Sequence, residues 1–142
     1  MDEASRPKVG VGVMILKDGK ALISQRMASH GKGEFQFVGG HLEHLESFEE
    51  CARRETFEET GLEIANIRFQ YLANTTHFAL KHYVHVALTA DWHSGEPQHL
   101  EPEKNGPWQW YALEDLPEPL LLFSQLHVRS MREGVSYFDD VA

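Results

Sequence analysis

The most informative segment of the 142-residue chain is GHLEHLESFEECARRETFEETGL, residues 40–62. Its second half is predicted to form a helix over residues 47–60. Ser47 followed three residues later by Glu50 is the pattern of a capping box, in which each side chain caps the other residue's backbone N–H. Gly61 follows the helix, where a left-handed C-terminal cap favours glycine. The segment therefore predicts a loop followed by a helix with defined ends.

Acidic side chains occupy a face of this helix that would normally be apolar. Glu55 and Glu59 are four residues apart and share one face, with Glu58 on its flank. Phe48 and Ala52 lie on the same face, so we expect that face to look toward the protein. Like charges at this spacing repel each other, and burial would increase the repulsion. A solvated, glutamate-rich helix is one interpretation; a site for a hard divalent cation such as Mg²⁺ is the other.

The rest of the chain predicts an α/β domain with a mixed sheet. Runs of apolar and β-branched residues predict strands over residues 9–16, 21–25, 34–38, 67–72, 82–90 and 108–112. A second helix is predicted over residues 120–132. Leu122, Leu126 and Met131 fall on one side of it. Because strands come before, between and after two helices, we expect one domain over residues 8–142, preceded by a flexible arm over residues 1–7.

Composition and charge narrow the functional classes. Hydrophobic residues make up 42% and charged residues 25%, as in an ordinary globular domain. A net charge of −9 argues against a nucleic-acid backbone as partner, but not against a small phosphate substrate delivered with metal ions. The single cysteine, Cys51, excludes an internal disulfide and suits a reducing cytoplasm. No apolar run approaches the roughly 18 residues of a membrane span, so we expect no membrane partner.

The whole central segment resembles the Nudix box, G-x5-E-x7-R-E-U-x-E-E-x-G-U, where U is a bulky apolar residue. The matching positions are Gly40, Glu46, Arg54, Glu55, Glu58, Glu59, Gly61 and Leu62. Thr56 departs from the pattern; we expect its methyl group to pack and its hydroxyl to bond the carbonyl one turn back. Val38 stands where relatives usually carry proline, and His44-Leu45 also differs from the subgroup's usual residues.

The resemblance implies a fold, a cofactor and a set of ligands. Members of the family fold as an α/β/α sandwich around a mixed sheet. By motif position, the metal ligands would be the Gly39 carbonyl, Glu55, Glu58 and Glu59. The metal would be Mg²⁺, with Mn²⁺ as a substitute. Glu46 and Arg54 would pair with each other and hold the loop against the helix.

The resemblance also implies metal-assisted hydrolysis of a phosphoanhydride bond, with a carboxylate as general base. Glu55 and Glu59 would belong to the catalytic centre, and Glu55 is the first candidate for the base. In MutT-type enzymes a downstream loop glutamate is the rival. Glu103, in the sequence LEPEK, is the candidate for that role.

Three further residues are candidates for substrate binding. In this subgroup the histidine after the Gly-Gly pair faces the phosphates, which indicates His41. Arg26 ends a predicted strand near that place, and a guanidinium suits bidentate phosphate binding. Phe37 alternates with Phe35 and could stack on a base, although such aromatic pairs more often belong to a core.

Resemblance outside the box extends over about residues 8–118 and includes GGHLE, EPEK and WQWYALEDLPEPL. It is closest to the MutT-type nucleotide triphosphate diphosphatases, which are commonly homodimers. This implies conversion of a nucleoside triphosphate, oxidised or modified dGTP among them, to a nucleoside monophosphate and pyrophosphate. Dihydroneopterin triphosphate and isoprenyl diphosphates remain alternative substrates, and a non-catalytic nucleotide-binding module remains an alternative function.

Overall fold

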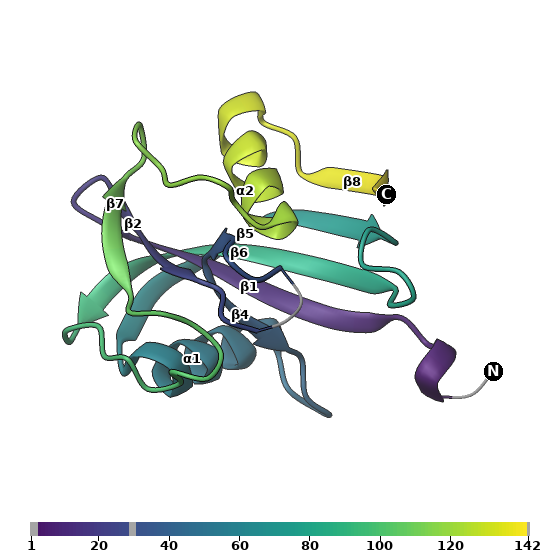
Figure 1. Cartoon of the computed structure of the whole chain (residues 1–142), viewed down its shortest axis with the longest axis horizontal. Helices are drawn as coiled ribbons and strands as arrows, with labels where there is room; N and C mark the ends of the chain where they lie inside the picture. The colour runs from purple at the N-terminus through teal and green to yellow at the C-terminus, as the bar shows by residue number, and fades with distance from the viewer. Residues whose placement is uncertain (1–2, 29–30, 142) are drawn as a thin grey trace.

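One mixed sheet forms the centre of the molecule, and the computed structural model describes it over residues 3–28 and 31–141 (Figure 1). The strands run in the order β3-β2-β1-β6-β5-β8, with β4 paired to β1 and β7 paired to β2. Their bounds are β1 Lys8–Lys17, β2 Lys20–Gln25, β3 Phe35–Gln36, β4 Val38–His41, β5 Glu63–Thr75, β6 Tyr83–Ser94, β7 Gln109–Ala112 and β8 Tyr137–Val141. The helices are η1 Glu3–Ser5, α1 Phe48–Thr60 and α2 Leu122–Glu133.

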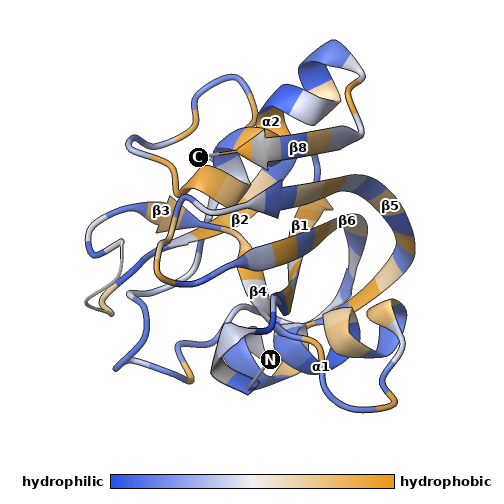
Figure 2. Ribbon diagram, turned by 90° about the vertical axis from the view of Figure 1, so that its right-hand side faces the viewer, coloured by the Kyte–Doolittle hydropathy of each residue, from blue (hydrophilic) through white to orange (hydrophobic). Residues whose placement is uncertain are grey.

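The two long helices cover opposite faces of this sheet, α1 on one side and α2 on the other (Figures 1 and 2). Residues of β1 alternate between the two faces, as a strand requires. Val11 and Val13 pack with Ala52 of α1, whereas Met14 faces the core on the other side, where Val128 of α2 also packs. The α/β/α sandwich with a mixed sheet is therefore confirmed.

The sheet is mixed because its central strand pairs differently on its two sides. β1 runs parallel to β6 over nine residue pairs, from Lys8 opposite Tyr83 to Leu16 opposite Asp91. It runs antiparallel to β2 and β4. Asp18 and Gly19 form the turn between β1 and β2 and have positive φ angles of 51° and 77°. A two-residue hairpin turn that matches the twist of its strands requires positive φ at both positions.

The ends of α1 are those that the sequence predicts. The Ser47 side chain accepts a hydrogen bond from the Glu50 backbone N–H, and the Glu50 side chain accepts one from the Ser47 N–H. Gly61 has φ 76° and its N–H donates to the Phe57 carbonyl. These local contacts fix where the helix begins and ends, and therefore where its glutamates lie.

The predicted strand over residues 34–38 is wrong, because the chain forms two short strands instead. β3 pairs with β2 and β4 pairs with β1. Phe37 separates them: its N–H donates to the Ser124 hydroxyl at 3.2 Å, so it joins neither ladder. Strands β5 and β6 are longer than predicted, and β8 was not predicted at all.

Three side-chain expectations also fail. Ala52 is buried as expected, but Phe48 is 45% exposed, because it stands in the first turn of α1, where the sheet no longer covers the helix. Met131 is exposed near the end of α2. The buried Thr56 hydroxyl has no hydrogen-bond partner; instead the Thr60 hydroxyl donates to the Thr56 carbonyl, which satisfies the carbonyl rather than the hydroxyl.

The described residues before β1 contribute no strand to the sheet. Within the segment expected to be a flexible arm, Glu3–Ser5 form one 3-10 turn; residues 1 and 2 lie outside the described part of the chain, as does residue 142. No helix among the described residues is both long enough and apolar enough to cross a membrane.

Candidate active site

Two glutamates of α1 meet the glycine backbone of β4. A Cβ atom placed on Gly40 would lie 2.1 Å from the Glu55 carboxyl carbon, so only glycine leaves room for that carboxyl group. The Gly39 N–H donates to Glu59 Oε2 at 3.3 Å. The strand therefore brings both carboxyl groups against main chain rather than against side chains.

These two carboxyl groups are buried beside each other, as their helical spacing predicts. Glu59 is 5% exposed and the Glu55 side chain is 13% exposed. Burial raises the pKa of both groups, and the charges of Glu55 and Glu101 raise that of Glu59 further. The two groups share a hydrogen bond that favours the proton on Glu59. A cationic partner would remove the cost of ionising this pair.

Arg54 is the cation that the chain itself supplies to this cluster. Its guanidinium contacts both oxygens of Glu46, at 2.6 Å and 3.0 Å, and its Nη1 also donates to Glu55 at 2.8 Å and Glu58 at 3.2 Å. The hydrogen bonds from Arg54 lower the pKa of Glu46 to about 2. The expected pairing of Glu46 with Arg54 is therefore present, and the same guanidinium also holds Glu55 in place.

The carboxyl groups of Glu55 and Glu59 fit a hard divalent cation, although the glutamates do not surround such an ion as they stand. Glu58 is turned toward Arg54 and its side chain is 50% exposed, so it does not converge with Glu55 and Glu59. Over residues 3–28 and 31–141, no three His, Cys, Asp or Glu side chains lie close enough together to hold a metal ion as they stand. Arg54 donates to Glu55, and Glu59 accepts from the Gly39 N–H and shares a hydrogen bond with the Glu55 carboxyl group. Paired carboxylates are typical ligands of Mg²⁺.

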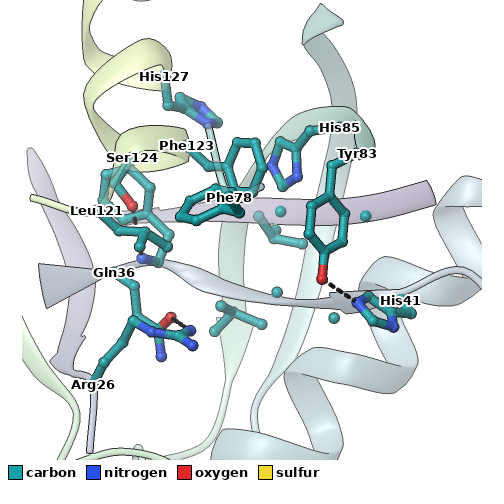
Figure 3. A pocket seen from close by; sticks show the side chains of 17 residues that line it. Arg26, Gln36, His41, Phe78, Tyr83, His85, Leu121, Phe123, Ser124 and His127 are labelled. Atoms are coloured by element: carbon teal, nitrogen blue, oxygen red, sulfur yellow. Dashed lines mark hydrogen bonds between the residues drawn. The ribbon is translucent and has the colours of Figure 1, made fainter. Parts of the chain in front are cut away.

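A pocket on the α2 face of the sheet shares the β4 backbone with this cluster (Figure 3). Gly39, Gly40 and His41 line the pocket, although Gly39 and Gly40 also contact the carboxyl groups. Aromatic and polar side chains together form its other walls. The aromatic residues are Phe37, Phe78, Tyr83 and Phe123, and the polar ones include Arg26, Gln36, Ser124, His85 and His127.

Arg26 lines the pocket and is close enough to the carboxyl cluster for the charge of Glu59 to act on it. Its Nη1 donates to Gln36 Oε1 at 2.7 Å, which points the guanidinium along the pocket wall (Figure 3). Burial lowers the pKa of Arg26, and the charges of Glu34, Tyr83 and Glu59 oppose that shift. The influence of Glu59 shows that the two groups are electrostatic neighbours. Arg26 therefore lines the same pocket as Gly39 and Gly40, and its role in phosphate binding stays a prediction.

His41 lines the pocket at the opposite end of β4. Its Nε2 pairs with the Tyr83 hydroxyl at 3.4 Å, and the two rings tilt against each other with centroids 5.7 Å apart. Burial and the nearby charges of Lys8, Lys81 and Lys104 lower the pKa of His41. The same lysines make this side of the site attractive to an anion.

Glu101, and not Glu103, is the loop carboxylate that faces the cluster. Glu103 is exposed, whereas the Glu101 side chain is 22% exposed and its charge acts on Glu59. Lys104 N and Asn105 N both donate to the Glu101 carbonyl, so EPEK folds as a turn that begins at Glu101. The proline after Glu101 favours such a turn and is the sequence signal that indicates this residue.

Several residues of the site were not singled out by the sequence. Lys104 pairs with Glu101 at 3.3 Å; burial opposes ionisation of Lys104, but Glu101, Glu59 and Glu55 raise its pKa. Tyr83 and His85 both line the pocket. Their spacing of two residues along a predicted strand places them on one face.

Phe37 lies in the pocket wall but remains part of the core. It is 6% exposed, and its ring meets His127 edge-on with centroids 5.4 Å apart. It also packs with Met14 and Ile23. Whether its exposed edge stacks on a base stays a prediction.

Comparison with known proteins gives the family. The NUDIX domain model matches residues 6–132. The chain is 31% identical over 120 residues to an oxidized purine nucleoside triphosphate hydrolase of Danio rerio, covering 80% of this chain and 69% of that protein. It is 29% identical over 123 residues to the NAD-capped RNA hydrolase NudC of Chromobacterium violaceum, covering 84% of this chain. The chain therefore belongs to the Nudix family, and it spans 45% of the length of that NudC protein.

Solved structures agree with this assignment. A MutT NUDIX hydrolase from Burkholderia pseudomallei superimposes with a TM-score of 0.82 at 30% identity, covering 88% of this chain and 98% of that one. The NUDIX domain of Shewanella oneidensis NrtR, solved with ADP ribose, superimposes with a TM-score of 0.77 over 91% of this chain and 88% of that one. At 21% identity, the second likeness shows the fold alone.

Proposed function

We propose that this chain is a Mg²⁺-dependent nucleoside triphosphate diphosphatase, which releases a nucleoside monophosphate and pyrophosphate. The observation that carries the proposal is the buried pair of Glu55 and Glu59 against the Gly39-Gly40 backbone, which also lines an aromatic pocket. This arrangement would hold phosphates at the carboxyl cluster and a ring system in the pocket. The likeness to a purine nucleoside triphosphate hydrolase supports the same choice.

Glu55 and Glu59 would be the principal ligands of the divalent cation, with the Gly39 carbonyl and Glu58 as further ligands. When bound, Mg²⁺, or Mn²⁺ in its place, supplies positive charge to the phosphates and makes the attacking water more acidic. Glu58 would have to leave Arg54 to take part, because its carboxylate lies 3.2 Å from that guanidinium. The exposed half of its side chain leaves it free to turn.

The proton of the attacking water would pass to a carboxylate of this chain. Glu55 remains the first candidate, because Arg54 at 2.8 Å holds its carboxyl group in place. The loop rival is Glu101 rather than Glu103, since Glu103 is exposed to solvent. The water oxygen would form the new bond to phosphorus while the bridging oxygen leaves with its electron pair.

Arg26, His41 and Phe37 would bind the substrate in separate ways. The Arg26 guanidinium would contact a phosphate through two N–H groups. His41 would donate a hydrogen bond to a phosphate oxygen, in place of its 3.4 Å pairing with Tyr83. Phe37 would contribute an apolar edge to the pocket that receives the ring.

The test is a product analysis with a panel of substrates. We expect ³¹P NMR to show pyrophosphate as the product with dGTP or oxidised dGTP, only when Mg²⁺ is present. A higher kcat/KM for dihydroneopterin triphosphate or geranyl diphosphate would favour the alternative substrates. Tight nucleotide binding without release of pyrophosphate at saturating Mg²⁺ would favour a non-catalytic binding module and would overturn the proposal.

Two properties of the whole protein belong to the same proposal. The family resemblance favours a homodimer, which light scattering on the purified protein would test. The buried, unpaired Cys51 suits a reducing cytoplasm. Burial raises its pKa to about 12, so this thiol is not a nucleophile in the proposed reaction.

A further inference from the structure

Lysines from three separate segments surround the end of the pocket at which Tyr83 and His41 lie (Figure 3). Lys8 begins β1, Lys81 lies two residues before β6, and Lys104 belongs to the EPEK turn. All three residues are exposed, and the charges of all three act on His41. The whole chain has 22 acidic and 13 basic residues, so the local charge here is opposite to that of the molecule. A positive charge beside a pocket attracts anionic ligands.

The pairing of the strands places Lys8 on the pocket face of the sheet. Lys8 lies opposite Tyr83 in the parallel pair, and Gly10 lies opposite His41 in the antiparallel pair. A Cβ atom on Gly10 would lie 3.9 Å from Tyr83 Cδ1, so Gly10 points to the face that carries the Tyr83 ring. Residues two apart in a strand share a face, and Lys8 is therefore on the same face as Tyr83 and His41.

Lys81 approaches the same end of the pocket from the loop before β6. The Lys8 N–H donates to the His82 carbonyl at 2.9 Å, so the residue after Lys81 is held against the start of β1. The Lys81 N–H donates to the Phe78 carbonyl at 2.8 Å, and Phe78 lines the pocket. Two backbone hydrogen bonds thus hold this part of the loop next to both Lys8 and the pocket wall.

Lys8 and Lys81 carry charges that the protein does not balance. Among residues 3–28 and 31–141, neither lysine forms an ion pair. Lys104 differs in this respect, because its ammonium group lies 3.3 Å from the Glu101 carboxylate. Neighbouring ammonium groups without a counterion repel each other, and an anion bound between them would replace that repulsion with attraction.

The position of these two lysines relative to the carboxyl pair indicates which part of a substrate they would meet. The Glu55 carboxyl group occupies the space beside Gly40, and His41 is the next residue of β4. Along the pairing of β1 with β4, the row of Gly40 is followed by the row of His41, and Lys8 lies two residues farther in the same direction. A chain of phosphates that reacts beside Gly40 and passes His41 would therefore reach Lys8 and Lys81 with its far end.

We propose that Lys8 and Lys81 form a subsite for the terminal phosphate of the substrate, which makes the protein prefer nucleoside triphosphates to nucleoside diphosphates. This inference rests on the proposed function and narrows its substrate class. A diphosphate would end near His41 and leave both ammonium groups without an anion. A terminal phosphate carries the charge that they lack, and charge-assisted hydrogen bonds to it would be made by the triphosphate alone.

The test compares nucleotides that differ only in the number of phosphates. Steady-state kinetics with Mg²⁺ are measured on dGTP and dGDP, with dATP and dADP as a second pair. The variants are Lys8→Gln and Lys81→Gln, singly and together. Lys20→Gln is the matched control, because Lys20 is an exposed lysine at the hairpin turn of β2 and its replacement removes the same charge as either single variant.

We expect the double variant to lower the ratio of triphosphate to diphosphate kcat/KM about tenfold, and each single variant to lower it about threefold. The loss should appear in the KM of the triphosphate, since the lysines bind a group that does not react. Lys20→Gln should leave the ratio unchanged. Replacing both Lys8 and Lys81 by arginine keeps the charges and should recover most of the preference.

An unchanged ratio in the double variant would overturn the inference, as would a wild type that cleaves diphosphates and triphosphates with kcat/KM values within twofold. In both cases release of pyrophosphate from the triphosphate would leave the proposed function intact. If the wild type hydrolyses no nucleotide, the proposed function fails, and calorimetry with Mg²⁺ then tests the subsite by itself. Tighter binding of dGTP than of dGDP, lost in the double variant, would support the inference; equal Kd values would overturn it.

Discussion

At the scale of single residues, the site depends on the absence of a side chain at Gly40. Gly40 has an ordinary backbone conformation, so its glycine is not needed for a left-handed turn. It is needed because the Glu55 carboxyl group occupies the space of its side chain. The motif glycine and the motif glutamate are therefore one structural unit, and neither can change without the other.

We predict that Gly40→Ala keeps the fold but displaces the Glu55 carboxyl group, and that kcat falls by about 10²-fold, as expected for a misplacement of about 1 Å. Gly106→Ala is the matched control, since its Cβ atom would meet nothing nearer than the Gln25 carbonyl at 3.8 Å. Steady-state kinetics with Mg²⁺ and a nucleoside triphosphate measure both variants. Equal activity of Gly40→Ala and wild type would show that this contact does not position the carboxyl group.

At the scale of elements, two strands and a helix on the α2 side of the sheet bury two neutral histidines. Burial lowers the pKa of both His85 and His127 from the ordinary 6.5 to about 3. Below pH 6.5 the unfolded chain therefore binds protons that the folded protein does not. This contribution to stability is complete above pH 6.5 and is lost as the pH falls toward 3.

We predict that between pH 7.5 and pH 5 each of these histidines accounts for about 2 kcal/mol of lost unfolding free energy, since about 1.5 pH units at about 1.4 kcal/mol each separate pH 5 from the ordinary pKa. His127→Asn should reduce the loss by that amount, whatever its effect at pH 7.5. Urea unfolding at the two pH values measures the difference. His93→Asn, an exposed histidine on the same strand as His85, is the control and should leave the loss unchanged.

The sequence predicts well those elements whose ends depend on contacts between residues close together in the chain. The ends of α1 follow from Ser47, Glu50 and Gly61, whose partners lie within four residues. The split between β3 and β4 follows instead from a hydrogen bond between Phe37 and Ser124, which are 87 residues apart. Nothing local to residues 34–38 carries that information.

In the site, too, the features that depend on local spacing are predictable and those that depend on distant contacts are not. The face shared by Glu55 and Glu59 follows from helical spacing alone. Which glutamate of LEPEK faces the cluster depends on how a loop is anchored, and the Arg26–Asn105 bridge supplies that anchor from a distant strand. The sequence therefore names Glu103 as the loop candidate without indicating that Glu101 acts on Glu59, whereas helical spacing alone places Glu55 beside Glu59.

At the scale of the whole molecule, the last strand completes the core on the α2 side. β8 pairs in parallel with β5, and Phe138 is 7% exposed, with its ring 5.4 Å from that of Tyr71. Its sequence, YFDDV, is short and partly acidic, so no run of apolar residues predicts this strand. The single domain expected over residues 8–142 stays a prediction.

We predict that Phe138→Ala lowers the free energy of unfolding by about 3 kcal/mol or more, as for other buried phenylalanines. Tyr137→Ala, its 62% exposed neighbour, should change it by less than about 1 kcal/mol. Urea denaturation of both variants gives the comparison. Equal stability of the two would mean that β8 does not belong to the cooperative core.

The central claim, that the buried carboxyl pair of α1 is the catalytic centre, is tested most directly by Glu59→Gln. Glu49→Gln is the matched control: Glu49 lies on the same helix, its side chain is 62% exposed, and it forms an ion pair with Arg53 at 3.2 Å. The measurement is kcat/KM for pyrophosphate release from a nucleoside triphosphate at saturating Mg²⁺, with melting curves for both variants. We predict a loss of about 10²-fold or more for Glu59→Gln in a folded protein and near wild-type values for Glu49→Gln. Full Mg²⁺-dependent hydrolysis by folded Glu59→Gln would contradict the account.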